Sequence, residues 1–384
     1  MATDNKSEEK LPLVIGVSIL DITMSMIDEI PPTMDGAMYH GISAQSAGGV
    51  GRNLAEVIYK LYGKVNFFSI VGDDVMGEIL LKRMPEALRC NVHKYPGGRT
   101  SSCNVIVDKK GDCKLILGDM EIHDAFDYNC FLLPNGRKCL EEASVIIIDA
   151  NLPLATIQWI LQQANRSRIP VFYEPTDLRI AGKIFSGIRC DDIYVIRLTT
   201  PNYAELQDIV KSEFGEDYKI DKVDLNNIEE TLKSVKRMLK DIDYMFDCVV
   251  VTLGQTGIVL SLNSSVDPYT QSLFRNQKYI FEPIRCDEFS KQIIFFPTPS
   301  VVKDVVSVSG AGDSFAGGFI SGLLKEYTVT QSIGLGFYAA KQALKTAAAV
   351  PEEYYPPGWE ECDLWQWQIQ ACKKRGCFNE KLLS

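Results

Sequence analysis

The sequence predicts an α/β fold, a three-layer α/β/α sandwich around a central and mainly parallel sheet, with a small β lid. The main observation is that short apolar runs rich in β-branched residues alternate with segments of helical periodicity from residue 11 to residue 350. A hairpin signal near residue 110 interrupts this alternation. The apolar runs end in polar, glycine or proline residues, as strands do at the ligand-binding edge of an open sheet.

The N-terminal third contains the first strands and helices. Residues 11–20 (LPLVIGVSIL) form an apolar run that predicts a buried strand ending at Asp21. Apolar residues at helical spacing predict a helix over 47–62, entered through glycine. A strand over 65–72 and a helix over 75–84 follow, which gives a βαβα unit.

The middle of the chain contains the hairpin signal and the later strands. Two strand-like arms surround Lys109-Lys110-Gly111-Asp112, which predicts a small sheet standing off the main one. Four further strands are predicted, over residues 143–150, 169–175, 192–199 and 247–254. Residues 264–291 have no clear period and are interpreted as an insertion or extended loop.

Composition and charge exclude several classes of protein. The chain is 46% hydrophobic and 23% charged with a net charge of −10, which argues against nucleic-acid binding. We expect no membrane segment, because no apolar run is long enough and the N-terminus is polar. Eleven scattered cysteines without a C-x-x-C pair indicate reduced thiols and a cytoplasmic protein. The three histidines show no zinc spacing.

The most informative stretch is residues 305–319 (VVSVSGAGDSFAGGF). A strand, a turn of small residues and a helix N-terminus meet there, so the backbone N–H groups of Ala311, Gly312 and Asp313 are available to an anion. Asp313 has two interpretations, since an acidic residue in a first helical turn often only caps the helix. The stretch matches neither the Walker A loop nor the dinucleotide fingerprint.

Gly310-Ala311-Gly312-Asp313 resembles the second signature of the PfkB, or ribokinase-like, carbohydrate and nucleoside kinases. Their first signature is similar to Gly48-Gly49-Val50-Gly51-Arg52-Asn53, followed by the predicted helix. The resemblance runs over residues 11–350, with residues 351–384 expected to be a tail packed on the core. It implies that the lid is formed by about residues 22–45 and 99–122 and that the lid also forms a homodimer interface.

Two segments resemble the pseudouridine kinases within that family, namely Gly118 to His123 (GDMEIH) and Glu174 to Asp177 (EPTD). This resemblance implies ATP-dependent phosphorylation of the 5′-hydroxyl of pseudouridine, with Mg²⁺ as cofactor. Two alternatives stay open: another kinase of the family that acts on adenosine or ribose, and an inactive nucleoside-binding protein.

The resemblance also implies roles for residues at the substrate side. Asp313 is the expected catalytic base, and the turn Gly310, Ala311 and Gly312 would stabilise the transferred phosphoryl group. Asp21 and Asn53 would bind ribose hydroxyls, although they could equally be a turn aspartate and a helix-entry amide. Gly48 and Gly49 resemble the hinge of the lid, with ordinary helix-entry glycines as the alternative. Asn151, after a predicted strand, could reach the substrate or be a loop residue.

The nucleotide side is expected further along the chain. Asn202 and Glu205 match an N-x-x-E motif, in which the amide faces the phosphates and the carboxylate organises Mg²⁺ through water, or Glu205 could be a surface acid. Thr252, Gly254 and Gly257 resemble the segment that admits ATP, with a hairpin turn as the alternative. Ser307 stands where many family members have an aspartate that supports a monovalent cation site, so potassium activation is not predicted.

Overall fold

The structure is a computed structural model of the 384-residue chain. It describes residues 10–355 with the exception of 29–35, 110–112, 133, 189, 221, 243, 270, 275–290 and 300.

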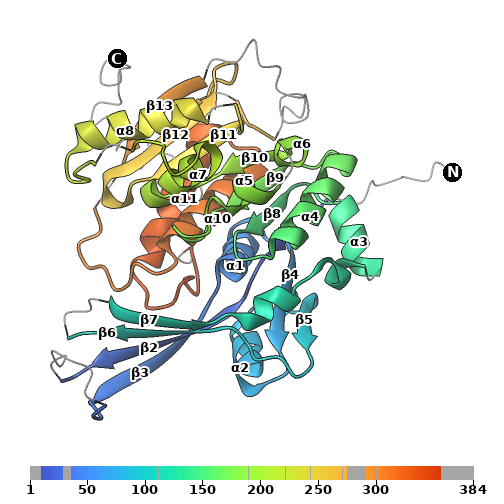
Figure 1. The fold of residues 1–384 in the computed structure, drawn as a ribbon, viewed down its shortest axis with the longest axis vertical. Helices are drawn as coiled ribbons and strands as arrows, with labels where there is room; N and C mark the ends of the chain where they lie inside the picture. The colour runs from blue at the N-terminus through green and yellow to red at the C-terminus, as the bar shows by residue number, and fades with distance from the viewer. Residues whose placement is uncertain are drawn as a thin grey trace.

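A large sheet forms the centre of the molecule (Figure 1). In the described part of the chain its strands lie in the following spatial order: β13 (Lys291–Pro297), β12 (Gly257–Asn263), β11 (Cys248–Thr252), β10 (Ile196–Thr199), β9 (Val171–Glu174), β8 (Ile146–Asp149), β1 (Leu13–Ile15), β4 (Asn66–Gly72) and β5 (Val92–Tyr95). The pairs from β11 to β5 are parallel, and only β12 and β13 run antiparallel to their neighbours. The mainly parallel sheet predicted from the sequence is confirmed, whereas β12 and β13 were not anticipated.

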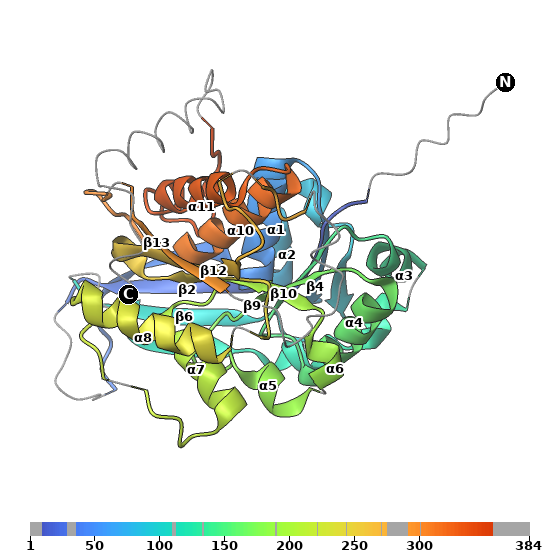
Figure 2. The same ribbon diagram turned by 90° about the horizontal axis from the view of Figure 1, so that it is seen from above.

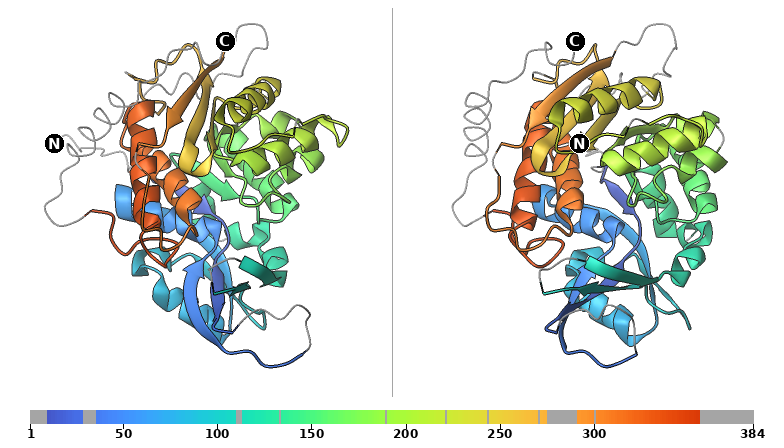
Figure 3. Two further views of the ribbon diagram at one scale, coloured as in Figure 1. Left: turned by 90° about the vertical axis from the view of Figure 1, so that its left-hand side faces the viewer. Right: turned by 60° about the vertical axis from the view of Figure 1, so that its left-hand side comes forward.

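The second sheet is the small β sheet that the hairpin signal predicted. Its order is β3 (Gly41–Gly48), β2 (Ile19–Met26), β6 (Ser102–Val107) and β7 (Cys113–Asp119). The β2–β6 pair is parallel and the two outer pairs are antiparallel. We call this the lid sheet; it lies at one end of the molecule, next to α1 (Figures 1 and 3).

The predicted first strand is wrong in one respect, because residues 11–20 do not form a single strand. β1 ends at Ile15, and β2 begins at Ile19 in the other sheet. Between them the Val17 N–H donates to the Asp149 carboxylate at 2.9 Å instead of to a neighbouring strand. An apolar run reports burial but not the sheet to which a residue belongs, which is why the sequence could not locate this break.

Helices cover both faces of the main sheet, which gives the three layers (Figure 2). One face carries α1 (Val50–Tyr62), α10 (Ala311–Leu324) and α11 (Val329–Ala343), with α2 (Val75–Arg83) near the lid sheet. The other face carries α3 (Pro134–Glu141), α4 (Leu154–Ser167), α5 (Lys183–Gly187), α6 (Cys190–Ile193), α7 (Tyr203–Phe214) and α8 (Ile228–Asp241). The 3-10 helices are η1 (Glu86–Leu88), η2 (Glu121–Ala125), η3 (Tyr128–Phe131) and η4 (Gly254–Thr256).

The strand sequences explain the two-sided burial. Every residue of β8 and β9 is buried, as expected for parallel strands covered on both faces. Separate hydrophobic cores therefore lie on the two sides of the sheet. Helix α1 contributes Leu54, Ala55 and Ile58 to one of these cores and ends at Gly63, whose φ of 98° suits glycine.

Close packing of α10 against α1 sets the geometry of the region described below. A Cβ atom at Gly317 would lie only 2.6 Å from Cγ1 of Val57, so the glycine lets the two helices approach. Because α1 carries Asn53 and α10 carries Asp313, this contact brings two motifs 260 positions apart into reach of each other.

Two regions expected from the sequence fall partly outside the described residues. These are residues 275–290 of the insertion and residues 356–384 of the C-terminal tail. Within the tail, Tyr354 is buried and its hydroxyl is 3.0 Å from Oγ of Ser314. Among the described residues, the model contains no helix with the length and apolar character of a membrane span.

Candidate active site

The N-terminus of α10 begins at the small-residue turn singled out in the sequence. Gly310 is the N-cap residue with φ of 73°, and a Cβ atom there would lie 2.1 Å from the Ala349 carbonyl oxygen. Only glycine fits both conditions. The first-turn N–H groups of an α-helix have no partner in the helix itself, so this turn can receive an anion.

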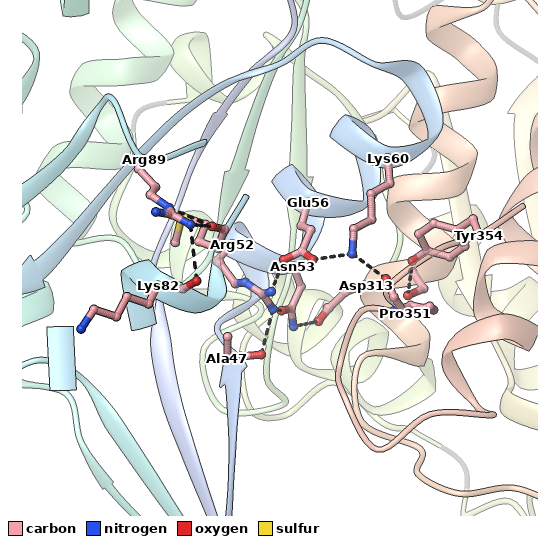
Figure 4. Close-up of polar contacts among 12 residues, drawn as sticks. Ala47, Arg52, Asn53, Glu56, Lys60, Lys82, Arg89, Asp313, Pro351 and Tyr354 are labelled. Carbon is pink, nitrogen blue, oxygen red and sulfur yellow. Dashed lines mark hydrogen bonds and ion pairs between the residues drawn. The ribbon is translucent and has the colours of Figure 1, made fainter. Parts of the chain in front are cut away.

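Asp313 lies in the first turn of α10 but its carboxylate does not cap the helix. The N-cap position is taken by Gly310, which makes no side-chain cap. The Oδ2 atom of Asp313 instead accepts a hydrogen bond of 2.6 Å from Nδ2 of Asn53 (Figure 4). Burial raises the pKa of Asp313 to about 6, while the Asn53 hydrogen bond and the Arg52 charge act in the opposite direction.

Asp21 belongs to the lid sheet rather than to the end of a main-sheet strand, which corrects the position expected from the sequence. In β2 it lies opposite Ser46 of β3 and Cys103 of β6. Burial raises the pKa of Asp21 to about 6; the charge of Arg52 lowers this value and that of Asp313 raises it. Asp21, Arg52 and Asp313 therefore interact electrostatically, although they lie on the lid sheet, α1 and α10, respectively.

The glycine pair between β3 and α1 leaves room for this arrangement. A Cβ atom at Gly48 would lie 2.0 Å from Oδ2 of Asp21. Gly49 has φ of 90°, and a Cβ atom there would be 2.5 Å from the Val17 carbonyl oxygen. Gly49 requires glycine in this conformation, whereas a side chain at Gly48 would displace the Asp21 carboxylate; whether the two glycines also act as a hinge stays a prediction.

Sequence reasoning missed Asp149, the last residue of β8. Its Oδ2 accepts hydrogen bonds from the backbone N–H groups of Val17 at 2.9 Å and Gly51 at 2.8 Å, and its Oδ1 accepts from Asn151 N–H at 3.0 Å. The carboxylate is fully buried, which raises its pKa to about 6 despite these three donors. It joins β8 to the end of β1 and the start of α1. The available signal was the polar residue at the end of an apolar run, whereas the sequence analysis assigned a role to Asn151, two positions later.

The N-x-x-E segment forms the N-terminus of α7. Asn202 is the N-cap, and Glu205 completes a reciprocal capping box, with the Asn202 N–H donating to Oε2 of Glu205 at 2.8 Å. Glu205 is nevertheless buried, and this burial raises its pKa to about 7. The carboxyl of Glu174, which accepts a 2.5 Å hydrogen bond from Thr200, is also buried and its pKa is raised.

Thr252, Gly254 and Gly257 form a turn between antiparallel strands β11 and β12, which is the hairpin alternative. Gly254 has φ of 56° and Gly257 has φ of 135°. An isolated parallel bridge joins Thr252 to Asn202, so the two segments expected on the nucleotide side lie next to each other at the carboxyl edge of the sheet. Neither feature tests a contact with ATP.

Arg52 is a second residue that sequence reasoning did not single out. It is 4% exposed, and it contacts both Asn53 and Glu56 on α1. The first signature contains it between two residues that were assigned roles, so the sequence offered a positional signal only. The described residues include no group of three or more His, Cys, Asp or Glu side chains arranged to hold a metal ion.

The cluster formed by Asp313, Asp21 and the N-terminus of α10 combines a proton acceptor with a site that favours an anion. It combines a partly buried carboxyl with a raised pKa, a helix N-terminus beside it, and a second carboxyl on the lid sheet. A carboxyl with a pKa near 6 is ionised at neutral pH and is more basic than an ordinary aspartate. Such a site suits the transfer of a group to a hydroxyl whose proton must be removed.

The proteins to which this chain is similar include kinases, which agrees with a site for group transfer to a hydroxyl. The chain matches the model of the pfkB family carbohydrate kinases over residues 17–352. It is 23% identical over 367 residues to the pseudouridine kinase of Arabidopsis thaliana, covering 89% of this chain and 93% of that relative. It is 22% identical over 320 residues to the adenosine kinase of Schizosaccharomyces pombe, covering 81% of this chain and 84% of the relative.

Solved structures share the fold. The ribokinase of Arabidopsis thaliana in complex with ribose and ATP aligns with a TM-score of 0.65, 15% identity, and coverage of 94% of this chain and 98% of that chain. The α/β class with its main sheet and small second sheet, predicted from the sequence, is therefore confirmed as a ribokinase-like fold.

Proposed function

Because the chain belongs to the pfkB family of carbohydrate kinases, and is therefore a phosphotransferase that acts on an alcohol group, we propose that it transfers the γ-phosphoryl group of ATP to the 5′-hydroxyl of pseudouridine. The observation that carries the reaction type is the Asn53–Asp313 contact at the N-terminus of α10. The choice of pseudouridine is supported by the resemblance to the Arabidopsis thaliana pseudouridine kinase over 89% of the chain.

In the proposed reaction Asp313 acts as the general base. The 5′-hydroxyl gives its proton to the Asp313 carboxylate as the oxygen attacks the γ-phosphorus of ATP, and the bond from that phosphorus to the β–γ bridging oxygen breaks to release ADP. The backbone N–H groups of the turn from Gly310 to Asp313 stabilise the charge on the transferred group, and the N–H of Ala311 would first have to leave the Val308 carbonyl oxygen, to which it donates at 3.3 Å. Asp21 accepts hydrogen bonds from the ribose hydroxyls, which fixes the nucleoside against the lid sheet.

The nucleotide is proposed to bind where the Asn202 and Thr252 segments meet. Mg²⁺ fits the acidic character of this edge, because burial and the charge of Glu205 raise the pKa of Glu174, and a nearby cation would favour the ionised carboxylates. No cluster of three ligands exists among the described residues, so Glu205 would hold the ion through water and the phosphates. When bound, the ion would neutralise phosphate charge.

Purified protein incubated with Mg-ATP and separate nucleosides tests the proposal. We expect ADP and a nucleoside monophosphate with pseudouridine, and we expect Asp313→Asn to abolish turnover while pseudouridine still binds in calorimetry. Turnover of adenosine or ribose but not pseudouridine would identify another kinase of the family. Adenosine is the second candidate because the yeast adenosine kinase resembles 81% of the chain. Binding without turnover of any substrate would identify a nucleoside-binding protein.

We further propose that two copies pair through the lid sheet. Two apolar side chains on one face of this sheet, Ile42 and Ile116, are 64% and 59% exposed. Such an open sheet is a typical pairing surface. Light scattering on the purified chain is expected to give the mass of a dimer, and Ile42→Asp with Ile116→Asp is expected to give a monomer. A monomeric wild-type protein at micromolar concentration would contradict this.

A further inference from the structure

A row of polar contacts lies behind Asp313 along one side of α1 (Figure 4). Nη1 of Arg52 donates to Oδ1 of Asn53 at 2.7 Å, and Nδ2 of Asn53 donates to Asp313 at 2.6 Å. Nη2 of Arg52 forms an ion pair with Glu56 one helical turn away. Glu56 in turn accepts a 2.6 Å hydrogen bond from Lys60.

The donor and acceptor chemistry of this row fixes the orientation of the Asn53 amide. A guanidinium has only donors, so the atom of Asn53 that faces Arg52 must be the amide oxygen. The amide nitrogen is consequently the atom that faces the Asp313 carboxylate. If the Arg52 contact were absent, the amide could rotate and place its oxygen against the carboxylate, which would be repulsive.

Arg52 is itself held in place at two further points. Nη1 also donates to the Ala47 carbonyl oxygen at 2.8 Å, at the end of the lid strand β3. At the other end of the row, Lys60 donates to the Pro351 carbonyl oxygen at 2.6 Å. The row is therefore anchored to the lid sheet on one side and to the segment after α11 on the other.

One feature of Arg52 is costly for stability. The guanidinium is 4% exposed, and within the described residues its Nε–H has no hydrogen-bond partner. Buried donors are normally paired, so this orientation of the guanidinium is kept at a cost in stability. The observed orientation satisfies Asn53, Ala47 and Glu56 instead.

We infer that Arg52 is a positioning residue for the proposed phosphoryl transfer: held by Glu56, it orients the Asn53 amide so that the amide nitrogen faces and holds the carboxylate of the general base Asp313. This inference rests on the proposed function only for the identity of the reaction. The contact itself belongs to the free protein and can be measured without turnover.

The charges around the base agree with this role. Arg52 is the cation that lowers the pKa of Asp313, and it acts on Asp21 of the lid sheet in the same direction. The charge of Asp313 adds to the effect of burial in raising the pKa values of three other carboxyls, Asp21, Glu205 of α7 and Glu174 of β9. Arg52 is therefore a cation placed among mutually repelling carboxylates.

The first experiment is a double-mutant cycle in the kinase assay. Arg52→Lys keeps the charge but loses the planar fork, so we expect kcat/KM to fall about tenfold, roughly the loss of one hydrogen bond to a charged group. If Arg52 acts through Asn53, Arg52→Lys made in an Asn53→Ala protein causes little further loss. Equal losses in both backgrounds would overturn the inference.

Arg197→Lys provides the matched control. Arg197 of β10 is also buried, at 7% exposure, and it forms an ion pair with Asp247, the residue before β11. We expect both lysine variants to lower the melting temperature, but only Arg52→Lys to lower kcat/KM of the folded protein. If Arg52→Lys lowered the melting temperature alone, its role would be structural and the inference would be wrong.

A second measurement separates this inference from the choice of substrate. In NMR spectra the Asn53 side-chain amide signals, assigned by their loss in Asn53→Ala, are expected to titrate near pH 6 with Asp313. The titration is expected to disappear in Asp313→Asn, to be altered in Arg52→Lys and to persist in Arg197→Lys. Unchanged Asn53 signals in Arg52→Lys would refute the inference, whereas absence of product with every nucleoside would refute only the proposed function.

Discussion

The pH dependence of turnover tests the electrostatics of the site most directly. Burial raises the pKa values of both Asp313 and Asp21 to about 6. Each is expected to act as an ionised carboxylate, the first to accept a proton and the second to accept hydrogen bonds. Activity is therefore lost as the pH falls through about 6, and because kcat/KM reports the free enzyme, its acid limb is expected to involve two protons.

Asn53→Ala perturbs only one of these two groups. It removes the 2.6 Å hydrogen bond to the ionised form of Asp313. Such a bond is worth about 1.5–3 kcal/mol, and one pKa unit corresponds to about 1.4 kcal/mol, so the pKa of Asp313 is expected to rise by about one to two units. The pKa of Asp21 is not expected to rise, because Asn53 is not among the groups that act on it and the charge of Asp313, which raises it, is then largely lost at the pH where Asp21 ionises.

The assay is ADP release with saturating ATP and limiting nucleoside, from about pH 5 to about pH 9, with product confirmed by chromatography. For Asn53→Ala we expect the steep limb to separate into two single-proton steps. Near pH 6.5 the loss relative to wild type is expected to be about three- to twentyfold larger than near pH 9, where the base is mostly ionised in both proteins. A loss that is the same at every pH would refute the reasoning and would leave Asn53 as a ribose ligand only.

Three further changes have expected outcomes. Gly48→Ala places a methyl group against Asp21, 2.0 Å from Oδ2, so KM for the nucleoside is expected to rise about tenfold or more with KM for ATP unchanged; equal effects on both substrates would contradict this. Gly310→Ala forces φ of 73° on an L-residue and places its Cβ atom 2.1 Å from the Ala349 carbonyl oxygen. We therefore expect the free energy of unfolding in urea to fall by about 2 kcal/mol or more and turnover to be reduced. An unchanged midpoint of urea unfolding would argue against the observed backbone conformation. Asp149→Ala leaves buried N–H groups unpaired, so the free energy of unfolding is expected to fall by about 2–4 kcal/mol, and wild-type stability would show that water replaces the carboxylate.

Much of the fold could be predicted because it is encoded locally. The apolar spacing of α1 and its stop at Gly63, the helix beginning at Ala311 and the runs of β8 and β9 all follow from periodicity and capping. The ends of strands could not be predicted where the chain passes from one sheet to the other or from a helix into a strand. Residues 11–20 divide between two sheets, and the predicted strand over 192–199 begins as helix α6 and becomes β10 only at Ile196.

The residues of the candidate site also differ in whether the sequence could reveal them. The segment containing Gly310 and Asp313 could be recognised because turn chemistry and a helix start leave a continuous signature. Asp149 could not, since its partners Val17 and Gly51 are 132 and 98 positions away and are backbone groups, which any residue provides. The capping box of Glu205 was also overlooked as a structural role, although its spacing is local.

The sequence by itself determined the main helices and most of the buried parallel strands, and that a small-residue turn would precede a helix with an acidic residue in its first turn. Only the tertiary structure decided that Asn53 faces Asp313, that Arg52 stands behind this pair, and that Asp21 approaches from the lid sheet. The physical reason is that local structure depends on neighbours within a few residues, whereas the orientation of a side-chain amide and the pKa of a buried carboxyl depend on charges and donors that packing brings together from distant parts of the chain.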